Sequence, residues 1–382
     1  MNIKSNIVCL MLVYPAAATL AQTNVWTEQA PMPVAAYGPA VGVINGLIFV
    51  AGGVSQSGHI TELQIFSANS NSWTTGSSMP LDAYAATPGV INGRLYVAGG
   101  QVPGANVANL EVYDPATNGW SSGALMPAAA SATCGGVING KFYVAAGTNP
   151  GNTGSVNTLW VYDPSNNTWT TLAPIPIALT WPAAAVWNGV LYVMGGDNAG
   201  TAVNSVEAYD PVANTWTSKA SMPVALEQLS AATINGIIYT FGGKVNLTGG
   251  GASAIVQAYN PATDSWLLAP SMPTARELLG IGVVSNIVYC IGGITDPGSI
   301  SLSTNEAFMP PSVLAIQMYA GLTIAGIAGL TYEIDYQNNS GSTNWNFLTD
   351  IVLSNSPTLF VDTNSTYFSH RFYRAVALPP AP

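Results

Sequence analysis

The sequence predicts an all-β protein in which six copies of a four-stranded repeat close into a β-propeller, followed by a small β-sandwich domain. The first observation is a tryptophan that stands 26 residues before a pair of small residues, six times over, at intervals of 47 to 50 residues. The second is an aromatic residue after each pair, and the third is a tight-turn dipeptide at a constant place in the repeat. Repeats of this length are typical of propellers and solenoids. The tryptophans are Trp26, Trp73, Trp120, Trp169, Trp216 and Trp266, and the pairs are Gly52-Gly53, Gly99-Gly100, Ala146-Gly147, Gly195-Gly196, Gly242-Gly243 and Gly292-Gly293.

Residues 1–21 have the features of an export signal. Lys4 gives a positive start, residues 7–14 are apolar, and residues 16–21 are mostly small. We expect cleavage after Ala21, with Ala18 as the alternative, and therefore a protein that is secreted, periplasmic or held at the cell surface. The apolar segment is too short to span a membrane, so no membrane insertion is expected.

Each repeat begins with two strands that we name a and b. Strand a is a run of small and apolar residues, such as residues 39–44, that ends at a hairpin dipeptide such as Asn45-Gly46. Strand b follows as an unbroken apolar run, such as residues 47–50, and the small-residue pair ends it. Unbroken apolarity predicts burial on both faces, which suits a strand between two neighbouring blades.

Strands c and d complete the repeat. Strand c ends in the aromatic residue, followed in several repeats by a turn such as Tyr113-Asp114-Pro115. Strand d carries the next tryptophan, 7 residues after the aromatic residue in the first five repeats. We expect the indole rings to pack between blades because each is large enough to bury roughly 200 Å².

These glycine pairs, Tyr-Asp-Pro turns and tryptophans resemble the kelch repeat over about residues 24–310. The resemblance implies a propeller with four antiparallel strands per blade, and six pairs imply six blades. Repeat three departs in having Ala146, and repeat one lacks the Asp-Pro turn after Phe66; we expect neither to change the fold. Ala315 stands where the tryptophan after Phe308 would be, so residues 24–30 are expected to supply the outer strand of blade six.

Length varies at only one place in the repeat, the connection between strands b and c. The second glycine of each pair precedes the aromatic residue by 13 residues in repeats one, two and four, and by 15 or 16 in the others. In an up-and-down blade the b–c and d–a connections emerge on one face, which we call the b–c/d–a face. Insertions confined to one face favour it as the binding side.

Side chains suited to holding a ligand are concentrated in the connections of this face. Aromatic rings beside amides and carboxylates favour a carbohydrate or polar peptide, so we expect Tyr37, Tyr84, Trp181, Gln228 and Arg276 to bind the ligand. The remaining polar side chains of these connections are Asp82, Glu227 and Glu277 in the d–a segments, and His59, Gln101, Asn149, Asp197, Asn198, Lys244, Asn246 and Asp296 in the b–c loops.

Residues 312–382 lack the repeat and predict the small β-sandwich. Alternation in 331–336 and around 345–348 indicates strands. Together with Arg371, these segments resemble C-terminal modules of secreted bacterial proteins.

Composition limits the possible chemistry. A net charge of −10 with only 8 Lys and Arg argues against nucleic acid. The two histidines, His59 and His370, lie in different predicted domains, so neither a metal site nor a Ser-His-Asp set can be assembled, and no cofactor is expected. Cys134 and Cys290 are expected to be buried thiols.

The sequence therefore favours a secreted binding or scaffold protein that recognises a glycan or a protein. The alternative is a cofactor-free sugar epimerase or mutarotase, because exported kelch-like propellers include enzymes resembling the sialic acid mutarotase. That chemistry needs an acid, a base and a cation for a sugar carboxylate, for which Glu227, Glu277 and Arg276 are the candidates.

Overall fold

The computed structural model describes residues 25–245, 251–295, 300–310, 320–324, 331–337, 346–352, 358–362 and 372–377. Described residues up to 310 form one compact unit, and those from 320 onward belong to a second. The regular structure in these ranges is entirely β-strand, without a helix. The expected export signal at residues 1–21 lies outside the described residues.

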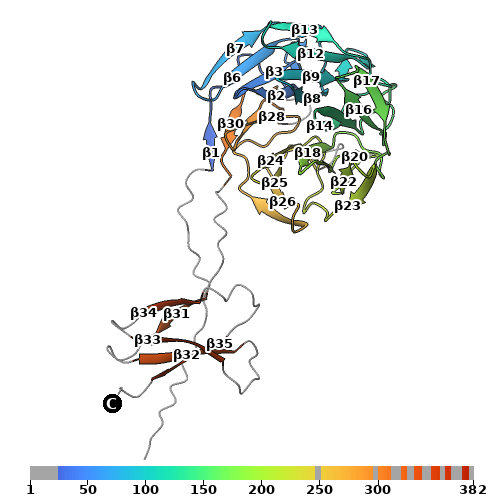
Figure 1. Cartoon of the computed structure of the whole chain (residues 1–382). Helices are drawn as coiled ribbons and strands as arrows, with labels where there is room; N and C mark the ends of the chain where they lie inside the picture. The colour runs from blue at the N-terminus through green and yellow to red at the C-terminus, as the bar shows by residue number, and fades with distance from the viewer. Residues whose placement is uncertain are drawn as a thin grey trace, which may run out of the picture. The chain divides into compact units, whose positions relative to one another are not determined.

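Six four-stranded antiparallel sheets surround a central axis, which confirms the six-bladed propeller (Figure 1). From the axis outward, blade one contains β2 (Ala40–Ile44), β3 (Leu47–Ala51), β6 (Leu63–Ser67) and β7 (Ser72–Gly76), and blade two contains β8 (Thr87–Ile91), β9 (Arg94–Ala98), β12 (Leu110–Asp114) and β13 (Gly119–Ser122). Blade three contains β14 (Cys134–Ile138), β15 (Lys141–Ala145), β16 (Leu159–Asp163) and β17 (Thr168–Thr171), and blade four contains β18 (Ala183–Trp187), β19 (Val190–Met194), β22 (Val206–Asp210) and β23 (Thr215–Ser218). Blade five contains β24 (Ser230–Ile234), β25 (Ile237–Phe241), β26 (Val256–Asn260) and β27 (Ser265–Ala269).

Blade six combines strands from both ends of the repeat region. Its strands are β28 (Gly280–Val284), β29 (Ile287–Ile291), β30 (Asn305–Phe308) and β1 (Trp26–Glu28), in that order from the axis outward. In the register of β1 against β30, Trp26 faces Phe308, as Trp120 faces Tyr113 in blade two. The N-terminal strand therefore occupies the place that strand d occupies in the other blades.

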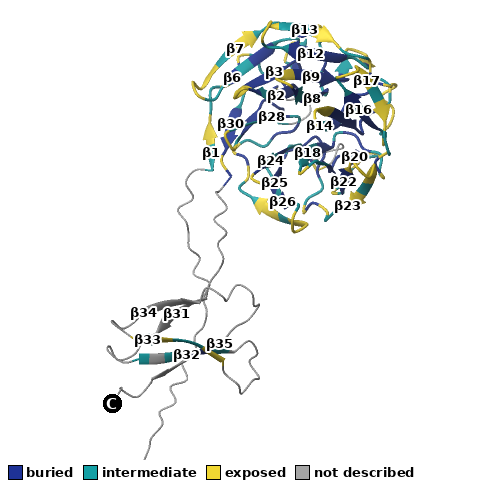
Figure 2. Ribbon diagram, viewed as in Figure 1, coloured by how far each residue is buried: buried dark blue, intermediate teal, exposed yellow. Residues whose placement is uncertain are grey.

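The core of the propeller lies between the blades. Six apolar clusters are present, and each joins two neighbouring blades. The b strands supply much of this core: in β3 and β9 only the first residue is exposed, whereas the outer strands β7 and β23 are largely exposed (Figure 2). The expected burial of strand b on both faces is confirmed.

Hydrogen bonds from the tryptophans link each blade to the preceding blade. Trp120 donates its indole N–H to the Ser77 carbonyl at 2.8 Å, and the Ser77 N–H donates to Asn118 Oδ1 at 2.8 Å. The hydroxyl of Tyr113 donates to the same Asn118 oxygen at 2.8 Å. Five further tryptophans make the equivalent indole bond, so the expected packing between blades is confirmed; they are Trp26, Trp73, Trp169, Trp216 and Trp266.

Among the residues that the structure describes, three b–c connections contain a short hairpin of their own on the b–c/d–a face. These hairpins join β4 (Val54–Ser55) to β5 (Gly58–His59), β10 (Gln101–Val102) to β11 (Ala105–Asn106), and β20 (Asp197–Asn198) to β21 (Thr201–Ala202). From the sequence these segments are expected to be plain loops. Two-residue strands are too short for a periodicity to identify.

The described segments of the second unit form a pair of strands and a three-stranded sheet. The pair is β31 (Ala320–Ile324) with β34 (Thr358–Asp362), and the sheet has the order β33 (Asn346–Val352), β32 (Thr331–Gln337), β35 (Phe372–Ala377). The strands expected around 331–336 and 346–348 are present, whereas Trp345, His370 and Arg371 lie outside the described residues. A β-sandwich built from these two groups of strands stays a prediction.

Candidate functional site

Six residues of the d–a connections form a closed ring of backbone hydrogen bonds around the axis. Each N–H in the ring donates to the carbonyl of the equivalent residue one blade earlier, at 2.7 to 3.0 Å, and Gly38 closes the circle by donating to Leu278. All six have positive φ, between 53° and 62°, which turns the chain into strand a. We call this the axial ring; its members are Gly38, Ala85, Ala132, Trp181, Gln228 and Leu278.

Aromatic side chains gather over blades one to four of the ring. Tyr84 contacts Tyr37 with ring centroids 6.1 Å apart and Trp181 with centroids 6.2 Å apart. His59, in β5, contacts the same Tyr84 ring at 5.2 Å and is fixed by a 2.8 Å bond between its Nδ1 and the Asp82 carbonyl. A Cβ on Gly38 would lie 2.9 Å from Tyr84 Cδ2, so the absence of a side chain there makes room for the ring. Burial raises the pKa of both tyrosines, and Tyr37 adds to the shift of Tyr84.

A cluster of charges lies on the other side of the ring, over blades four to six. Lys244 Nζ is 3.8 Å from Glu277 Oε2, and the backbones of Lys244 and Glu227 pair in an isolated bridge. Asp197 occupies in blade four the position that Lys244 occupies in blade five, directly after the glycine pair. All four side chains are buried, and they carry three negative charges and one positive charge when ionised.

Burial raises the pKa of Glu227 to about 7, and the charges of Asp197 and Glu277 add to this effect against the opposing charge of Lys244. The Glu227 side chain is 0% exposed, and neither carboxylate oxygen has a hydrogen-bond partner. An ionised carboxylate in such a place loses its hydration without compensation, which favours the protonated form. Glu227 can therefore gain or lose a proton near neutral pH.

A cavity of about 450 Å³ opens between blades three and four beside this cluster. Asp197 and Thr180 line it from blade four, and Asn152, Thr153 and Ser155 line it from blade three. The blade-three residues belong to one of the lengthened b–c connections, so the extra residues there help to build the cavity. Its polar wall consists of hydroxyls, amides and one carboxylate.

The structure brings together most of the residues expected to bind a ligand. Tyr37, Tyr84 and Trp181 meet in one aromatic cluster, and Gln228 is the neighbour of Trp181 in the axial ring. Gln228 is buried, and its Oε1 has no hydrogen-bond partner. Glu227 and Glu277 lie in the charge cluster, whereas Asn246 and Asp296 are outside the described residues.

Arg276 does not belong to this group, which departs from its expected role as the cation of the site. Its side chain is 0% exposed, and its guanidinium forms an ion pair with Glu306 in β30 at 2.5 Å. Its Nη1 donates to the carbonyls of Gly292 and Thr304, both at 3.2 Å. Arg276 is thus held within blade six, and Lys244 is the cation near the two glutamates.

Sequence reasoning did not select Thr180, Asn152, Thr153 or Ser155. Hydroxyl and amide residues in loops are so common that their types alone give no signal. For Asn152, Thr153 and Ser155, the greater length of the b–c connection in repeat three was the feature of the sequence that could have indicated a site.

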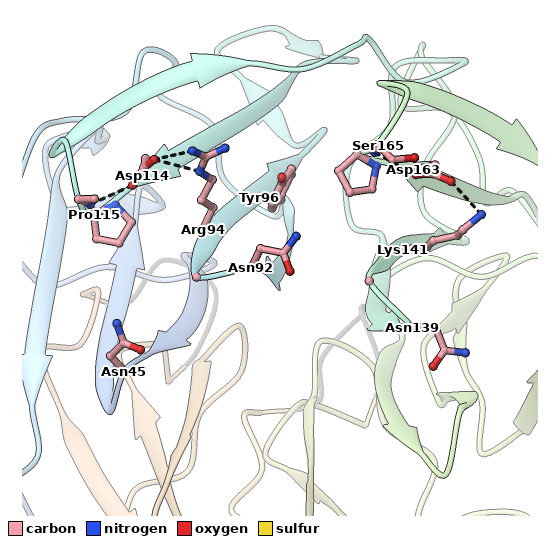
Figure 3. Close-up of a pocket in the computed structure, with 14 residues that line it drawn as sticks. Asn45, Asn92, Arg94, Tyr96, Asp114, Pro115, Asn139, Lys141, Asp163 and Ser165 are labelled. Carbon is pink, nitrogen blue, oxygen red and sulfur yellow. Dashed lines mark hydrogen bonds and ion pairs between the residues drawn. The ribbon is translucent and has the colours of Figure 1, made fainter.

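A larger groove, of about 1030 Å³, lies on the opposite face over blades one to three (Figure 3). Its cations are already neutralised: Arg94 pairs with Asp114 at 2.8 Å, and Lys141 pairs with Asp163 at 2.9 Å (Figure 3). Hydrogen bonds from Ser165 and Lys141 lower the pKa of Asp163 to about 2. Each pair lies within a single blade, two or three. Size is therefore the only property that favours this groove as the ligand-binding site, whereas buried groups without partners favour the b–c/d–a face.

The described ranges offer neither a metal cluster nor a membrane-spanning helix. No group of three or more His, Cys, Asp or Glu side chains there could hold a metal ion. None of the described segments forms a helix long and apolar enough to cross a membrane. Cys134 and Cys290 are free and buried, as expected.

The model of the KLHDC2/KLHL20/DRC7 Kelch-repeats domain matches residues 11–180 and 132–308. The chain belongs to the kelch-repeat family. A solved structure titled "Structure of YjhT" is similar to this kelch protein with a TM-score of 0.66 and 18% sequence identity, over 75% of this chain and 98% of that one. At this identity the likeness shows the fold alone. No curated protein matches the chain. A kelch propeller suggests a binding or scaffold role, which is the coarser part of the function expected from the sequence.

Proposed function

We propose that this kelch protein is a carbohydrate-binding protein that acts outside the cytoplasm and recognises its ligand on the b–c/d–a face. The observation that supports the site is the cavity between blades three and four, where a buried carboxylate, Asp197, stands in a wall of hydroxyls and amides. A cavity of about 450 Å³ is within the size range of small-molecule sites. The export features of residues 1–21 support the location.

The neighbouring aromatic cluster supports a sugar over an extended peptide. Trp181 directly follows Thr180, which lines the cavity, and Trp181 contacts Tyr84. Aromatic rings offer an apolar face to the C–H side of a sugar while the wall of the cavity bonds to its hydroxyls. Each ring is only partly exposed and anchored by its backbone, so little side-chain freedom is lost on binding.

The proposal is tested by applying the purified full chain to a glycan array. We expect one class of glycan to be retained and the signal to be lost in Trp181→Ala and Tyr84→Ala. Leu267→Ala, which removes an exposed apolar side chain from the outer strand of blade five, serves as the matched control. Retention of the glycan by both aromatic variants would refute the proposed face.

A second candidate, cofactor-free isomerisation of a reducing sugar, is supported by Glu227, whose pKa of about 7 suits a general acid or base. Lys244, in place of Arg276, would be the cation for this chemistry. Two observations favour binding over catalysis: Glu227 is 0% exposed, and the surplus of negative charge disfavours a carboxylate substrate. NMR exchange spectroscopy of anomer interconversion separates the two functions, because catalysis would be abolished by Glu227→Gln.

A further inference from the structure

We infer that the cavity between blades three and four selects sugars that carry a free, protonated amine. This inference rests on the proposed carbohydrate-binding function and specifies its ligand class. The supporting observation is a carboxylate without a counter-ion in an otherwise neutral polar wall. Aromatic rings and further carboxylates lie next to it.

Asp197 is the charged group of the cavity wall. It is 4% exposed, and its Oδ1 accepts hydrogen bonds from the Gly200 N–H at 3.1 Å and the Thr180 hydroxyl at 3.4 Å. Its Oδ2 has no hydrogen-bond partner, and no ion pair to Asp197 is present in the described part of the chain. A buried carboxylate without a counter-ion is costly, so a cationic group bound near it gains a charge-assisted interaction.

The surrounding charges strengthen this preference. The charge of Asp197 acts directly on Glu227, and Glu277 lies in the same cluster, against Lys244 as the single cation. The other cations of the described propeller are engaged or distant. Arg94 and Lys141 are paired on the opposite face, Arg276 is paired with Glu306, and Lys219 follows the outer strand β23 and acts on Asp264.

Buried acceptor atoms without hydrogen-bond partners also favour a cationic ligand. Beside the cavity, Asp197 Oδ2 and Gln228 Oε1 are buried without partners, and both accept hydrogen bonds; Glu227 is fully buried and acts there through its charge alone. A ligand that complements such a region must be rich in donors, and an ammonium group offers three donors and a positive charge. The partly exposed faces of Trp181 and Tyr84 favour a cation further through cation–π attraction.

Three classes of sugar should bind with different affinity. Those with a free amine are complementary in charge, neutral and N-acetylated sugars can only exchange hydrogen bonds, and acidic sugars are repelled by the cluster. A charge-assisted hydrogen bond contributes about 1.5–3 kcal/mol, which corresponds to roughly 10- to 100-fold in affinity.

The test is a ligand-observed NMR titration of the full chain with glucosamine, galactosamine, their N-acetyl derivatives, glucose and galactose, at about pH 6, where a primary amine is protonated. We expect the amine sugars to bind at least about tenfold more tightly than their neutral counterparts. Asp197→Asn keeps the shape of the side chain and should remove this difference. Glu28→Gln, the same chemical change on the exposed strand β1, should leave it intact.

A second variant keeps the test independent of the folding of Asp197→Asn. Asn152 lies on the exposed rim of the cavity, so Asn152→Asp adds a negative charge there and should tighten binding of the amine sugars several-fold. Equal affinities for amine and neutral sugars, or an amine preference unaffected by both variants, would overturn the inference and leave the proposed function standing. Failure of every sugar to bind would overturn both.

Discussion

The indole nitrogen of Trp26 donates a hydrogen bond to the carbonyl of Pro270 at 3.1 Å, across 244 positions of the chain. In all five other blades the residue that accepts the indole bond also donates its N–H to an asparagine or aspartate in the turn between strands c and d. Proline has no N–H to donate, and blade six has no such turn because β30 and β1 are far apart in sequence. The contact that closes the propeller therefore has the indole hydrogen bond but lacks the second hydrogen bond found between the other blades.

Trp26→Phe should lower the free energy of unfolding by about 1 kcal/mol because it removes the indole donor and keeps most of the packing. Trp26→Ala should cost about 3 kcal/mol, because the ring also packs on Phe308 with centroids 4.8 Å apart. Denaturant unfolding measures both values. Thr27→Ala, on the exposed side of the same strand, is the control, and an equal effect of the alanine substitutions at 26 and 27 would contradict the closing role of Trp26.

The buried pair of Arg276 and Glu306 can be replaced by the residues that blade five uses at the same places. Leu226 aligns with Arg276, and Gln257 aligns with Glu306; Gln257 bonds both to the N–H and to the carbonyl of Val224. Arg276→Leu alone leaves Glu306 buried without its partner and should cost about 3–5 kcal/mol. Arg276→Leu combined with Glu306→Gln should recover most of this loss in thermal or denaturant unfolding. A double variant no more stable than the single one would contradict this account.

Gly243, the second glycine of its pair, should tolerate alanine less well than a glycine in a hairpin turn. Gly243 has a φ of 92°, and a Cβ there would lie 2.5 Å from the Glu227 carbonyl oxygen. Gly243→Ala should therefore cost more than about 3 kcal/mol in denaturant unfolding. Gly46→Ala, at a hairpin position with a φ of 77° and open space around it, should cost only about 1 kcal/mol. Similar losses at both positions would show that the close approach between blades is unimportant.

Trp181 adopts a φ of 57°, which an L-residue with a large side chain takes at an energetic cost. Trp181→Gly should therefore be more stable than Trp181→Ala by about 1 kcal/mol, although both lose the aromatic surface. At Val212, an exposed residue without a positive φ, the order should reverse and Val212→Ala should be the more stable variant. Thermal unfolding of the four variants checks the prediction; the same order at both positions would count against it.

The stability of the protein should depend on pH through Glu227. Its folded pKa of about 7 lies above the ordinary value of 4.5, so the folded state binds more protons than the unfolded state between these values. The free energy of unfolding should therefore fall as pH rises from about 4.5 to about 7, by up to a few kcal/mol, and this contribution should level off above. Glu227→Gln should remove that slope in denaturant unfolding across the range. An unchanged slope in the variant would exclude Glu227 as its source.

The repeat made most of the fold predictable from sequence, because each blade repeats the same contacts at constant offsets. The absence of a tryptophan after Phe308 indicated the missing strand of blade six, and β1 occupies that place. The second unit has no repeat to compare, so its strands could be expected but not their assembly.

The site was less predictable because alignment and burial had to be considered together. Arg276 stands 10 residues after Trp266, at the offset that carries Ala36, Ala83, Ala130, Leu179 and Leu226 in the other repeats. The small and apolar residues at this position in the other repeats indicated that it is buried. Glu306, the ion-pair partner of Arg276, stands two residues before the aromatic Phe308. By contrast, Tyr84 and Trp181 meet across blade three because Ala132 intervenes there with only a methyl group, a contact that the spacing of the repeats does not reveal.

The axial ring is built from main-chain atoms alone, yet its six positions carry glycine, alanine twice, tryptophan, glutamine and leucine. The hydrogen bonds around the axis are thus compatible with side chains of very different size and polarity. Substitutions can change the side chains of that surface one blade at a time while the main-chain hydrogen bonds remain. This protein is therefore a suitable starting point for engineering new specificities.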